Sequence, residues 1–474
     1  MKRTIYLLLA LTIIFASCDK DEPSGGGTDN PGSGITDEPN ITDEPGSNDP
    51  NKEPDVDGVV NGRMEGGQII ADGIHFRLIS NTDEGIIEVS GIESKSLTKV
   101  VIPGGVRVNG KTYTVASIGE QVFLGYRSLT GIELPNSVTN IAARAFSGCT
   151  GLSFIIIGNS VTNIGMGAFE GCTGLTYAIL GNSVTNIGDR AFYGCNALTR
   201  VELPNSTTIL GNYVFYGCSS LADITIPHSV KNIGAYAFTG CSSLTSVEIP
   251  NSVTALYRAT FRDCIGLSHV VIPNSVTVLG GEVFSNCRGL SSIELPDALT
   301  TLGTDYTNSE ELLAGGGVFA GCTGLRGITI PNTVTRIGNS AFSGCTGLRT
   351  LTIPNAVTSV DADAFRGCTG LTSIEIGNSV TELGQNVFFG CTGLTEITIP
   401  RSVASIGTRA FEGCIGLRAV TVFWDNPIFI QTGTFGSGNT SSIRLATLYV
   451  PTGTKARYAA ADNWKSFPNI VERN

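Results

Sequence analysis

Twelve of the thirteen cysteines in this chain recur at an almost unvarying interval. They stand 23 residues apart from Cys149 to Cys287 and again from Cys322 to Cys414, with one interval of 35 residues between the two runs. A Phe precedes each of these cysteines by three residues, and a Leu follows each by three. A fixed period of this size is typical of proteins built from stacked repeats. The period therefore predicts a solenoid, in which each repeat packs only against its neighbours.

The repeat reads L-x-x-I-x-I-P-x-S-V-T-x-I-G-x-x-A-F-x-G-C-T-G. Its first part alternates apolar and polar residues, which predicts a short strand with one buried face. Pro or Gly then ends the strand, and Val-Thr-x-Ile predicts a second short extended segment. Gly-x-x-Ala-Phe predicts a change of direction, either a plain turn or a single helical or 3₁₀ turn. No single repeat can bury its own apolar side chains, so the repeats must stack.

This consensus resembles the 23-residue leucine-rich repeats of the BspA-like family of bacterial surface proteins, and the similarity extends over residues 97–451. The resemblance implies a right-handed coil stack with a concave parallel sheet, exposed on the cell surface and used for adhesion or ligand capture. We therefore expect a β-rich solenoid with short turns or helical turns on its other side. A β-rich N-terminal cap and a small C-terminal cap are expected to close its ends, because open ends would expose core and sheet edges.

Residues 1–18 have the features of a signal peptide. Lys2 and Arg3 precede an apolar run that is too short to span a bilayer comfortably. The end of this segment, Phe15-Ala16-Ser17-Cys18, resembles a bacterial lipobox, with Phe15 at the position where Leu is usual. That resemblance implies export, lipidation of Cys18 and a surface-exposed anchor in the outer membrane, with no other membrane contact. The alternative is an ordinary secretory signal in which Cys18 has no role.

Residues 19–57 combine six prolines with twelve acidic residues and two lysines. Low hydrophobicity with high charge predicts a disordered, extended tether. This segment accounts for most of the net charge of −11, so the rest of the chain is nearly neutral. A nearly neutral domain has no basic field for nucleic acid, and we expect no such partner.

The remaining residues divide into three segments. Residues 58–128 are predicted to form the N-terminal cap and a divergent first repeat, with a type I′ hairpin at Asn109-Gly110. Residues 129–422 carry the regular repeats, interrupted by an insertion at 304–315. Residues 423–474 are predicted to hold a last divergent strand at 445–451 and a C-terminal cap. A short helix over 455–464 would let Trp464 and Phe467 cover the open end of the stack.

The regularly spaced cysteines are predicted to be buried and free. Each stands at the same place in its repeat beside a Phe, and free Cys is among the most buried residue types. Disulfides between neighbouring coils are an alternative, because the Cα atoms of adjacent coils lie within disulfide range. Side chains in register point the same way, however, so the dihedral angle that a disulfide requires would distort the coil. No CxxC pair exists and the three histidines are far apart in repeat register, so we expect no metal and no cofactor.

Familiar catalytic motifs are missing, and we expect the chain not to be an enzyme. There is no HExxH, P-loop, GxSxG or Rossmann glycine pattern. Carboxylates do recur at the centre of the first strand, and in a β-solenoid carbohydrate-active enzyme such a row could serve as acid and base. The alternative is that they solvate an exposed strand position; they are Glu133, Glu202, Glu248, Glu294 and Glu375.

The outward positions of the first strand are where ligand contacts can vary without disturbing the core. In two successive repeats these positions are apolar, and in the next repeat they hold one basic and one acidic residue. The six residues are Phe154, Ile156, Tyr177, Ile179, Arg200 and Glu202. A contiguous exposed apolar patch with aromatic and Arg anchors often marks an interaction site. The alternative is that the N-terminal cap folds over these residues or that the strand buries them.

Two further candidates lie outside the predicted sheet. Five tyrosines cluster on the turn side and could stack against sugar rings or pack among themselves: Tyr193, Tyr213, Tyr216, Tyr236 and Tyr257. The insertion could carry function through its own polar residues, which are Asp305, Tyr306, Glu310 and Glu311.

These observations together predict a monomeric surface protein that binds an extracellular protein through the solenoid face. A glycan-binding surface module is the alternative, and a β-solenoid carbohydrate-active enzyme is a third hypothesis.

Overall fold

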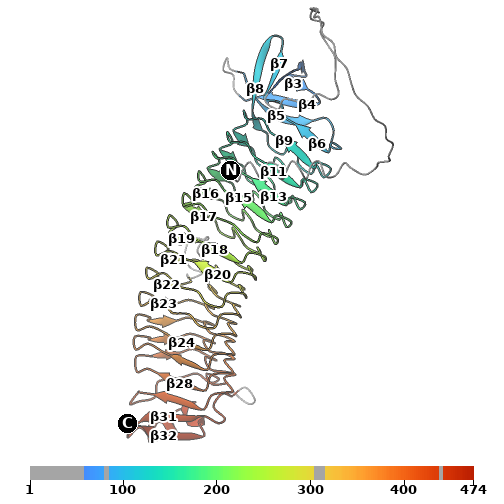
Figure 1. Cartoon of the computed structure of the whole chain (residues 1–474). Coiled ribbons are helices and arrows are strands. Elements are labelled where there is room, and N and C mark those ends of the chain that lie inside the picture. The colour runs from blue at the N-terminus through green and yellow to red at the C-terminus, as the bar shows by residue number, and fades with distance from the viewer. Residues whose placement is uncertain (1–57, 80–84, 304–314, 437–440, 474) are drawn as a thin grey trace, which may run out of the picture. The chain divides into compact units, whose positions relative to one another are not determined.

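The computed structural model describes residues 58–79, 85–303, 315–436 and 441–473. All of these belong to the second of two compact units, Pro54–Asn474. The predicted signal peptide, the lipidation site at Cys18 and the acidic tether lie outside the described residues, as does most of the insertion. The described part is a β-solenoid of about 15 turns with almost no helix (Figure 1).

The first strands of the repeats pair in parallel in five short sheets of two to four strands, and paired residues in the regular repeats are 23 residues apart. Phe154 lies beside Tyr177, and Tyr177 beside Arg200. We call the outward side of this row the sheet face. Its strands are β6 (Lys99–Val101), β9 (Gly131–Glu133), β11 (Phe154–Ile156), β13 (Tyr177–Ile179), β15 (Arg200–Glu202), β18 (Ser246–Glu248), β20 (His269–Val271), β24 (Thr350–Thr352), β26 (Ser373–Glu375), β28 (Glu396–Ile399), β30 (Ala419–Val422), β31 (Thr447–Pro451) and β32 (Asn469–Arg473).

The predicted second extended segment forms a separate row of short parallel strands, and each contributes an apolar residue to the core. Leu302 pairs with Ile337, so the row continues across the insertion in unbroken register. Its strands are β10 (Asn140–Ile141), β12 (Asn163–Ile164), β14 (Asn186–Ile187), β16 (Ile209–Leu210), β17 (Asn232–Ile233), β19 (Ala255–Leu256), β21 (Val278–Leu279), β22 (Thr301–Leu302), β23 (Arg336–Ile337), β25 (Ser359–Val360), β27 (Glu382–Leu383) and β29 (Ser405–Ile406).

The third side of each described coil consists of plain turns. Of the two alternatives predicted for the Gly-x-x-Ala-Phe segment, the helical or 3₁₀ turn is not the one that forms. Backbone hydrogen bonds join these turns from coil to coil, as from Phe146 N to Ala168 O at 2.7 Å. The residue before each Cys has a positive φ and is usually Gly. Asp263 and Asn286 take this place in two coils with φ of 59° and 61°, because Asp and Asn tolerate the left-handed region better than other residues with a side chain.

The core is a continuous column of stacked phenylalanines beside a column of free cysteines. The ring centroids of Phe146 and Phe169 are 5.2 Å apart, and similar stacking continues to Phe435. All twelve cysteines among the described residues are free and buried, as predicted, and the Cys149 thiol donates to the Phe123 carbonyl at 3.1 Å. Burial, with a smaller contribution from the Cys172 thiol, raises the pKa of Cys149 to about 12. Buried thiols of this kind are chemically inert.

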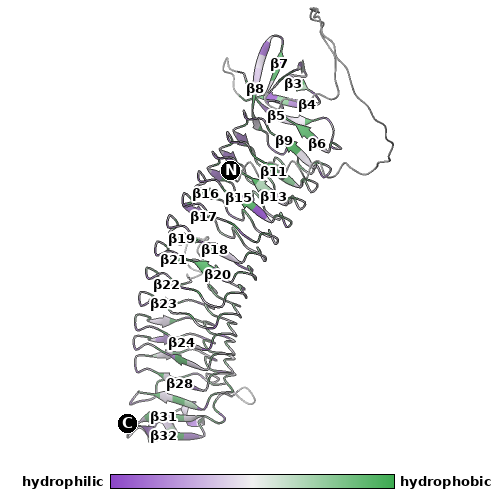
Figure 2. Cartoon of the chain, viewed as in Figure 1, coloured by the Kyte–Doolittle hydropathy of each residue, from purple (hydrophilic) through white to green (hydrophobic). Residues whose placement is uncertain are grey.

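The stack begins with a β-rich cap. Strands β2 to β5 form an antiparallel meander, and the predicted type I′ hairpin is confirmed by φ of 51° at Asn109 and 82° at Gly110. Apolar residues occur on strands from this cap to the last coil (Figure 2). The strands of the cap are β1 (Val59–Asn61), β2 (Arg63–Glu65), β3 (Gln68–Ala71), β4 (Ile74–Leu78), β5 (Ile86–Ile92), β7 (Gly105–Val108) and β8 (Lys111–Ile118).

The stack ends as predicted in a short helix and a buried Trp. After α2 (Lys455–Ala460) comes the 3₁₀ helix η2 (Trp464–Ser466). Trp464 is 1% exposed and lies against Phe435, the last ring of the column, with centroids 6.0 Å apart. The prediction that 445–451 holds the last strand was wrong, because β32 pairs with β31 and adds one more. No helix among the described residues has the length and apolar character that a membrane crossing needs.

Candidate functional site

The structure brings all six residues of the predicted sheet-face site together. We call them the aromatic patch. Register pairing places three of them side by side in a first outward column and three in a second, on β11, β13 and β15. The first column holds Phe154, Tyr177 and Arg200, and the second holds Ile156, Ile179 and Glu202.

The side chains of the aromatic patch are partly exposed to solvent, and its polar members are held by a hydrogen bond and an ion pair within the patch. Ile156 is 37% exposed, and the other apolar members are half-buried. The Tyr177 hydroxyl donates to Glu202 Oε1 at 2.7 Å, and an Arg200 nitrogen lies 3.3 Å from the same oxygen. On its N-terminal side β9 lies next to β11, and β9 pairs with β6 in a separate two-stranded sheet. The patch is therefore a half-exposed apolar surface with a charged, hydrogen-bonded edge.

A groove follows the aromatic patch along the sheet face, and sequence reasoning missed it. It consists of three successive hollows of about 300, 530 and 600 Å³ that span residues 223–271, 272–331 and 332–423. Its lining includes prolines that follow the first strand or its equivalent segment, such as Pro250, Pro296 and Pro354. Residues of both outward columns and the residues after these prolines also line it. We call this feature the sheet-face groove; the recurring Pro-Asn pair was its sequence signal.

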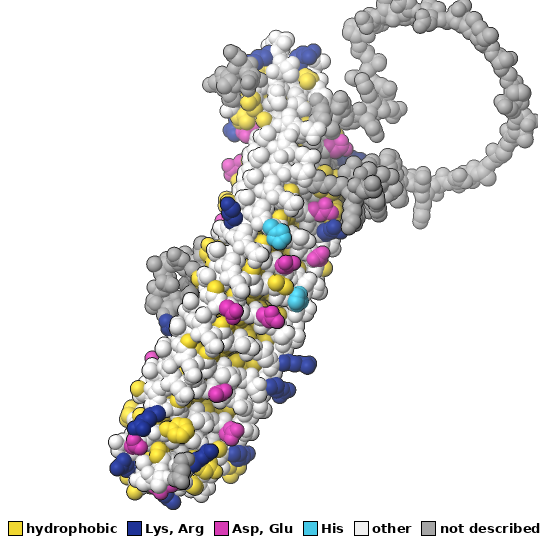
Figure 3. Space-filling view, turned by 60° about the vertical axis from the view of Figure 1, so that its left-hand side comes forward, with side chains coloured by type: hydrophobic (Ala, Val, Ile, Leu, Met, Phe, Trp, Pro, Cys, Tyr) yellow, Lys and Arg dark blue, Asp and Glu magenta, His cyan; other side chains and the backbone are white. Residues whose placement is uncertain are grey.

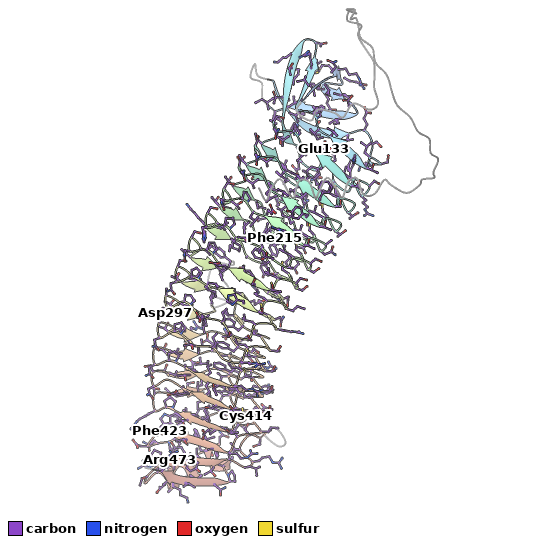
Figure 4. All side chains as sticks on the ribbon, viewed as in Figure 1. Glu133, Phe215, Asp297, Cys414, Phe423 and Arg473 are labelled. Atoms are coloured by element: carbon purple, nitrogen blue, oxygen red, sulfur yellow. The ribbon has the colours of Figure 1, made fainter. Side chains whose placement is uncertain are left out.

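The C-terminal end of the groove has an aromatic and ionic boundary. A fourth hollow of about 350 Å³ lies here, lined in part by Phe423, Tyr449 and Arg473. Phe423 is 47% exposed, and Arg473 lies 6.0 Å from the centre of the Tyr449 ring. Asp297, Phe423 and Arg473 lie along one edge of the stack (Figure 4). Sequence reasoning did not single out these aromatic residues, because they depart from the repeat consensus only in the last coils.

Four tyrosines of the cluster form two stacked pairs, which are joined by a tilted contact between Tyr213 and Tyr216 at 5.9 Å. Tyr193 stacks on Tyr216 with centroids 4.8 Å apart, and Tyr213 stacks on Tyr236 at 4.7 Å. Tyr257 stands in a different column, in register with Gly234. Stacking covers one face of each ring, and the Arg190 guanidinium lies 5.8 Å from the centre of the Tyr193 ring and 5.4 Å from that of Tyr213, which leaves less ring surface for a sugar. This geometry favours the alternative prediction, a surface ladder in which the tyrosines pack among themselves.

The insertion leaves the stack beside an ionic cluster on the turn side. Its described flanks are Gly303 with φ of 85° and Gly315 with φ of 114°, conformations that favour glycine. Glu282 pairs with Arg258 at 2.7 Å and also with Arg262, and a Cβ on Gly315 would lie 3.8 Å from the Arg258 guanidinium. The predicted functional residues Asp305, Tyr306, Glu310 and Glu311 lie outside the described residues.

The sequence matches the family described as "BspA type Leucine rich repeat region (6 copies)" over residues 93–222, 185–312 and 315–441. These matches cover well over half of the chain. The chain belongs to the BspA-type leucine-rich repeat family. No protein of curated function matches it.

Solved structures of bacterial leucine-rich repeat proteins resemble this BspA-type stack. A leucine-rich repeat protein from Bacteroides ovatus is 29% identical, with a TM-score of 0.66, over 80% of this chain and 99% of that one. A leucine rich cell surface protein from Faecalibacterium prausnitzii is 28% identical, with a TM-score of 0.49, over 72% of this chain and 94% of that one. The first of these likenesses supports the same fold over nearly the whole of the neighbour.

The carboxylates that recur in the repeats of this BspA-type stack lie along the sheet face. Glu133, Glu202, Glu248, Glu294 and Glu375 stand in the second outward column. Glu248 and Glu294 are two coils apart, about 10 Å at the usual inter-strand spacing, and both line the sheet-face groove. In the described part of the chain no group of His, Cys, Asp and Glu could hold a metal ion. Leucine-rich repeat solenoids are typically binding modules.

Proposed function

We propose that this chain is a cell-surface binding protein that recognises an extracellular protein through its sheet face, with the aromatic patch as the anchor. The observation that carries the proposal is the in-register array of Phe154, Ile156, Tyr177 and Ile179, half-exposed beside the Arg200–Glu202 pair. Aromatic residues and Arg are enriched among the residues that contribute most to protein binding. A glycan ligand is less well supported, because the tyrosines that would stack on sugars stack on each other.

Replacing both aromatic anchors tests this function. In a pull-down from extracellular matrix and mucus, the wild-type chain is expected to capture a protein that the Phe154→Ala/Tyr177→Ala variant does not. Each anchor is expected to contribute on the order of 2 kcal/mol to binding, so the measured affinity should fall by at least about a hundredfold. Phe389→Ala, a half-buried aromatic on the turn side, is the matched control and should leave capture unchanged. Equal capture by the wild type and the double variant would refute the role of the patch.

The proposal includes export, lipidation at Cys18 and an anchored position on the outer membrane, with the chain acting as a monomer. It is supported by the signal-peptide pattern of residues 1–18 and by the lipobox-like Phe15-Ala16-Ser17-Cys18. Stable anchoring needs more than one acyl chain, which a lipidated N-terminal Cys would carry. Cys18→Ser is expected to move the protein from the membrane fraction to the soluble fraction. Mass spectrometry of the wild-type N-terminus that finds an unmodified Cys18 would contradict this assignment.

A further inference from the structure

The sheet-face groove has a charge distribution unlike that of the rest of the folded chain. In the part of the chain that the structure describes, neither Lys nor Arg lines its three hollows. Six exposed acidic residues do line them: Asp223, Glu248, Glu294, Asp297, Glu375 and Glu396. Acidic side chains follow the middle of this face, and basic side chains gather at its edges and its C-terminal end (Figure 3). The groove is therefore anionic although the folded part as a whole is nearly neutral.

These carboxylates differ from those on the turn side in having no cationic partner. Among the residues described by the structure, none of the six forms an ion pair. On the turn side, by contrast, Glu282 pairs with Arg258 and Arg262, and Glu412 pairs with Arg409 at 2.6 Å. Internal pairing has therefore neutralised carboxylates on the turn side and left those of the groove available to a partner. Complementary charge across an interface directs association and excludes partners of like charge.

The spacing of the carboxylates suits an extended chain that runs along the groove. Glu248 and Glu294 are separated by two coils, which is about 10 Å. An extended or polyproline II segment advances roughly 3.1 to 3.4 Å per residue, so every third residue returns to the same position relative to the groove. The groove also offers apolar contact for long side-chain stems, because Val271 is 42% exposed between the two.

We infer that the protein partner presents an extended segment with Lys or Arg at about every third residue, and that this segment lies in the sheet-face groove. The grounds are the groove itself, its unpaired negative charge and its position next to the aromatic patch. This inference rests on the proposed function and specifies the chemistry of its partner. The acidic segment 19–57 of this chain, with twelve acidic residues and two lysines, has the wrong charge to be that occupant. The aromatic patch would hold an apolar part of the same partner.

A peptide without an apolar anchor tests the groove separately from the patch. The probe is a fluorescein-labelled peptide of four Lys-Pro-Thr repeats, titrated with the full chain and followed by anisotropy. A peptide of four Glu-Pro-Thr repeats is the charge-reversed control. The test variant is Glu248→Gln/Glu294→Gln. The matched variant, Glu120→Gln/Glu382→Gln, removes two exposed carboxylates outside the groove and changes the net charge equally.

We expect the basic peptide to bind, the acidic peptide not to bind, and added salt to weaken binding. Exposed ion pairs contribute modestly, so the groove variant should lose affinity by about threefold to tenfold while the matched variant keeps it. The Phe154→Ala/Tyr177→Ala variant should bind the peptide normally, so a failure of the patch would leave this result standing. Absence of peptide binding, equal affinity for both peptides, or equal losses in the two Glu→Gln variants would overturn the inference.

Discussion

Phe238→Ala is expected to lower the free energy of unfolding by about 3 to 5 kcal/mol, the usual cost of removing a buried Phe side chain. Phe238 is fully buried in the middle of the phenylalanine column. Its ring stacks on Phe215 at 5.5 Å and on Phe261 at 5.3 Å. The substitution leaves a cavity that the neighbouring coils cannot fill, because each is held in register by its own backbone bonds. Denaturant unfolding followed by circular dichroism measures the loss.

Phe423→Ala is the control for this substitution, because it removes the same side chain from an exposed position on the sheet-face groove. It is expected to change the free energy of unfolding by less than about 1 kcal/mol, as surface substitutions generally do. Similar losses for the two variants would mean that the phenylalanine column does not hold the stack together.

Trp464→Ala is expected to destabilise the C-terminal end by a similar 3 to 5 kcal/mol, with the effect confined to the coils nearby. Trp464 is almost fully buried against Phe435, and its indole nitrogen donates to the Ile428 carbonyl at 2.8 Å. In a stack whose stability is a sum of repeat and interface contributions, loss of a cap unfolds the adjacent repeats first. Hydrogen exchange should therefore rise in the coils around 394–436 and remain slow around 146–238.

Trp464→Phe separates loss of the cap from loss of a hydrogen bond. It keeps most of the apolar contact and removes the bond to Ile428, so its effect should be about 1 to 2 kcal/mol. A uniform rise in hydrogen exchange along the whole stack after Trp464→Ala would show that the coils unfold as one unit, against this expectation.

The fold was predictable because one consensus constrains every coil at once. Leu, Ile, Phe and Cys at a fixed spacing can all be buried only if identical coils stack in register, and Phe146 over Phe169 illustrates the result. The ends were less predictable, because they depart from the consensus. Strand β32 followed the expected last strand, since an irregular five-residue strand carries no repeat spacing by which to recognise it.

The candidate site was predictable only in part. The aromatic patch followed from strand register, because residues 23 apart must be neighbours in a parallel row. The sheet-face groove is lined by Pro250 and by residues of three neighbouring coils together, and a sequence pattern alone does not show which of these residues enclose a hollow. The tyrosine pairs show the same limit, because the spacing of Tyr213 and Tyr236 brought them together but did not reveal which ring faces stay open.

The hydrogen bonds between coils run along the axis of the stack, as they do between the paired strands of any sheet. Tension applied along that axis is carried by every boundary between coils, and the weakest boundary separates first because each coil is bonded only to its neighbours. Release of one coil replaces a rise of about 5 Å with up to roughly 80 Å of extended chain, since 23 residues can each span about 3.4 Å. Under load the stack would therefore lengthen in steps and dissipate mechanical energy, while the coils still folded keep the proposed binding surface.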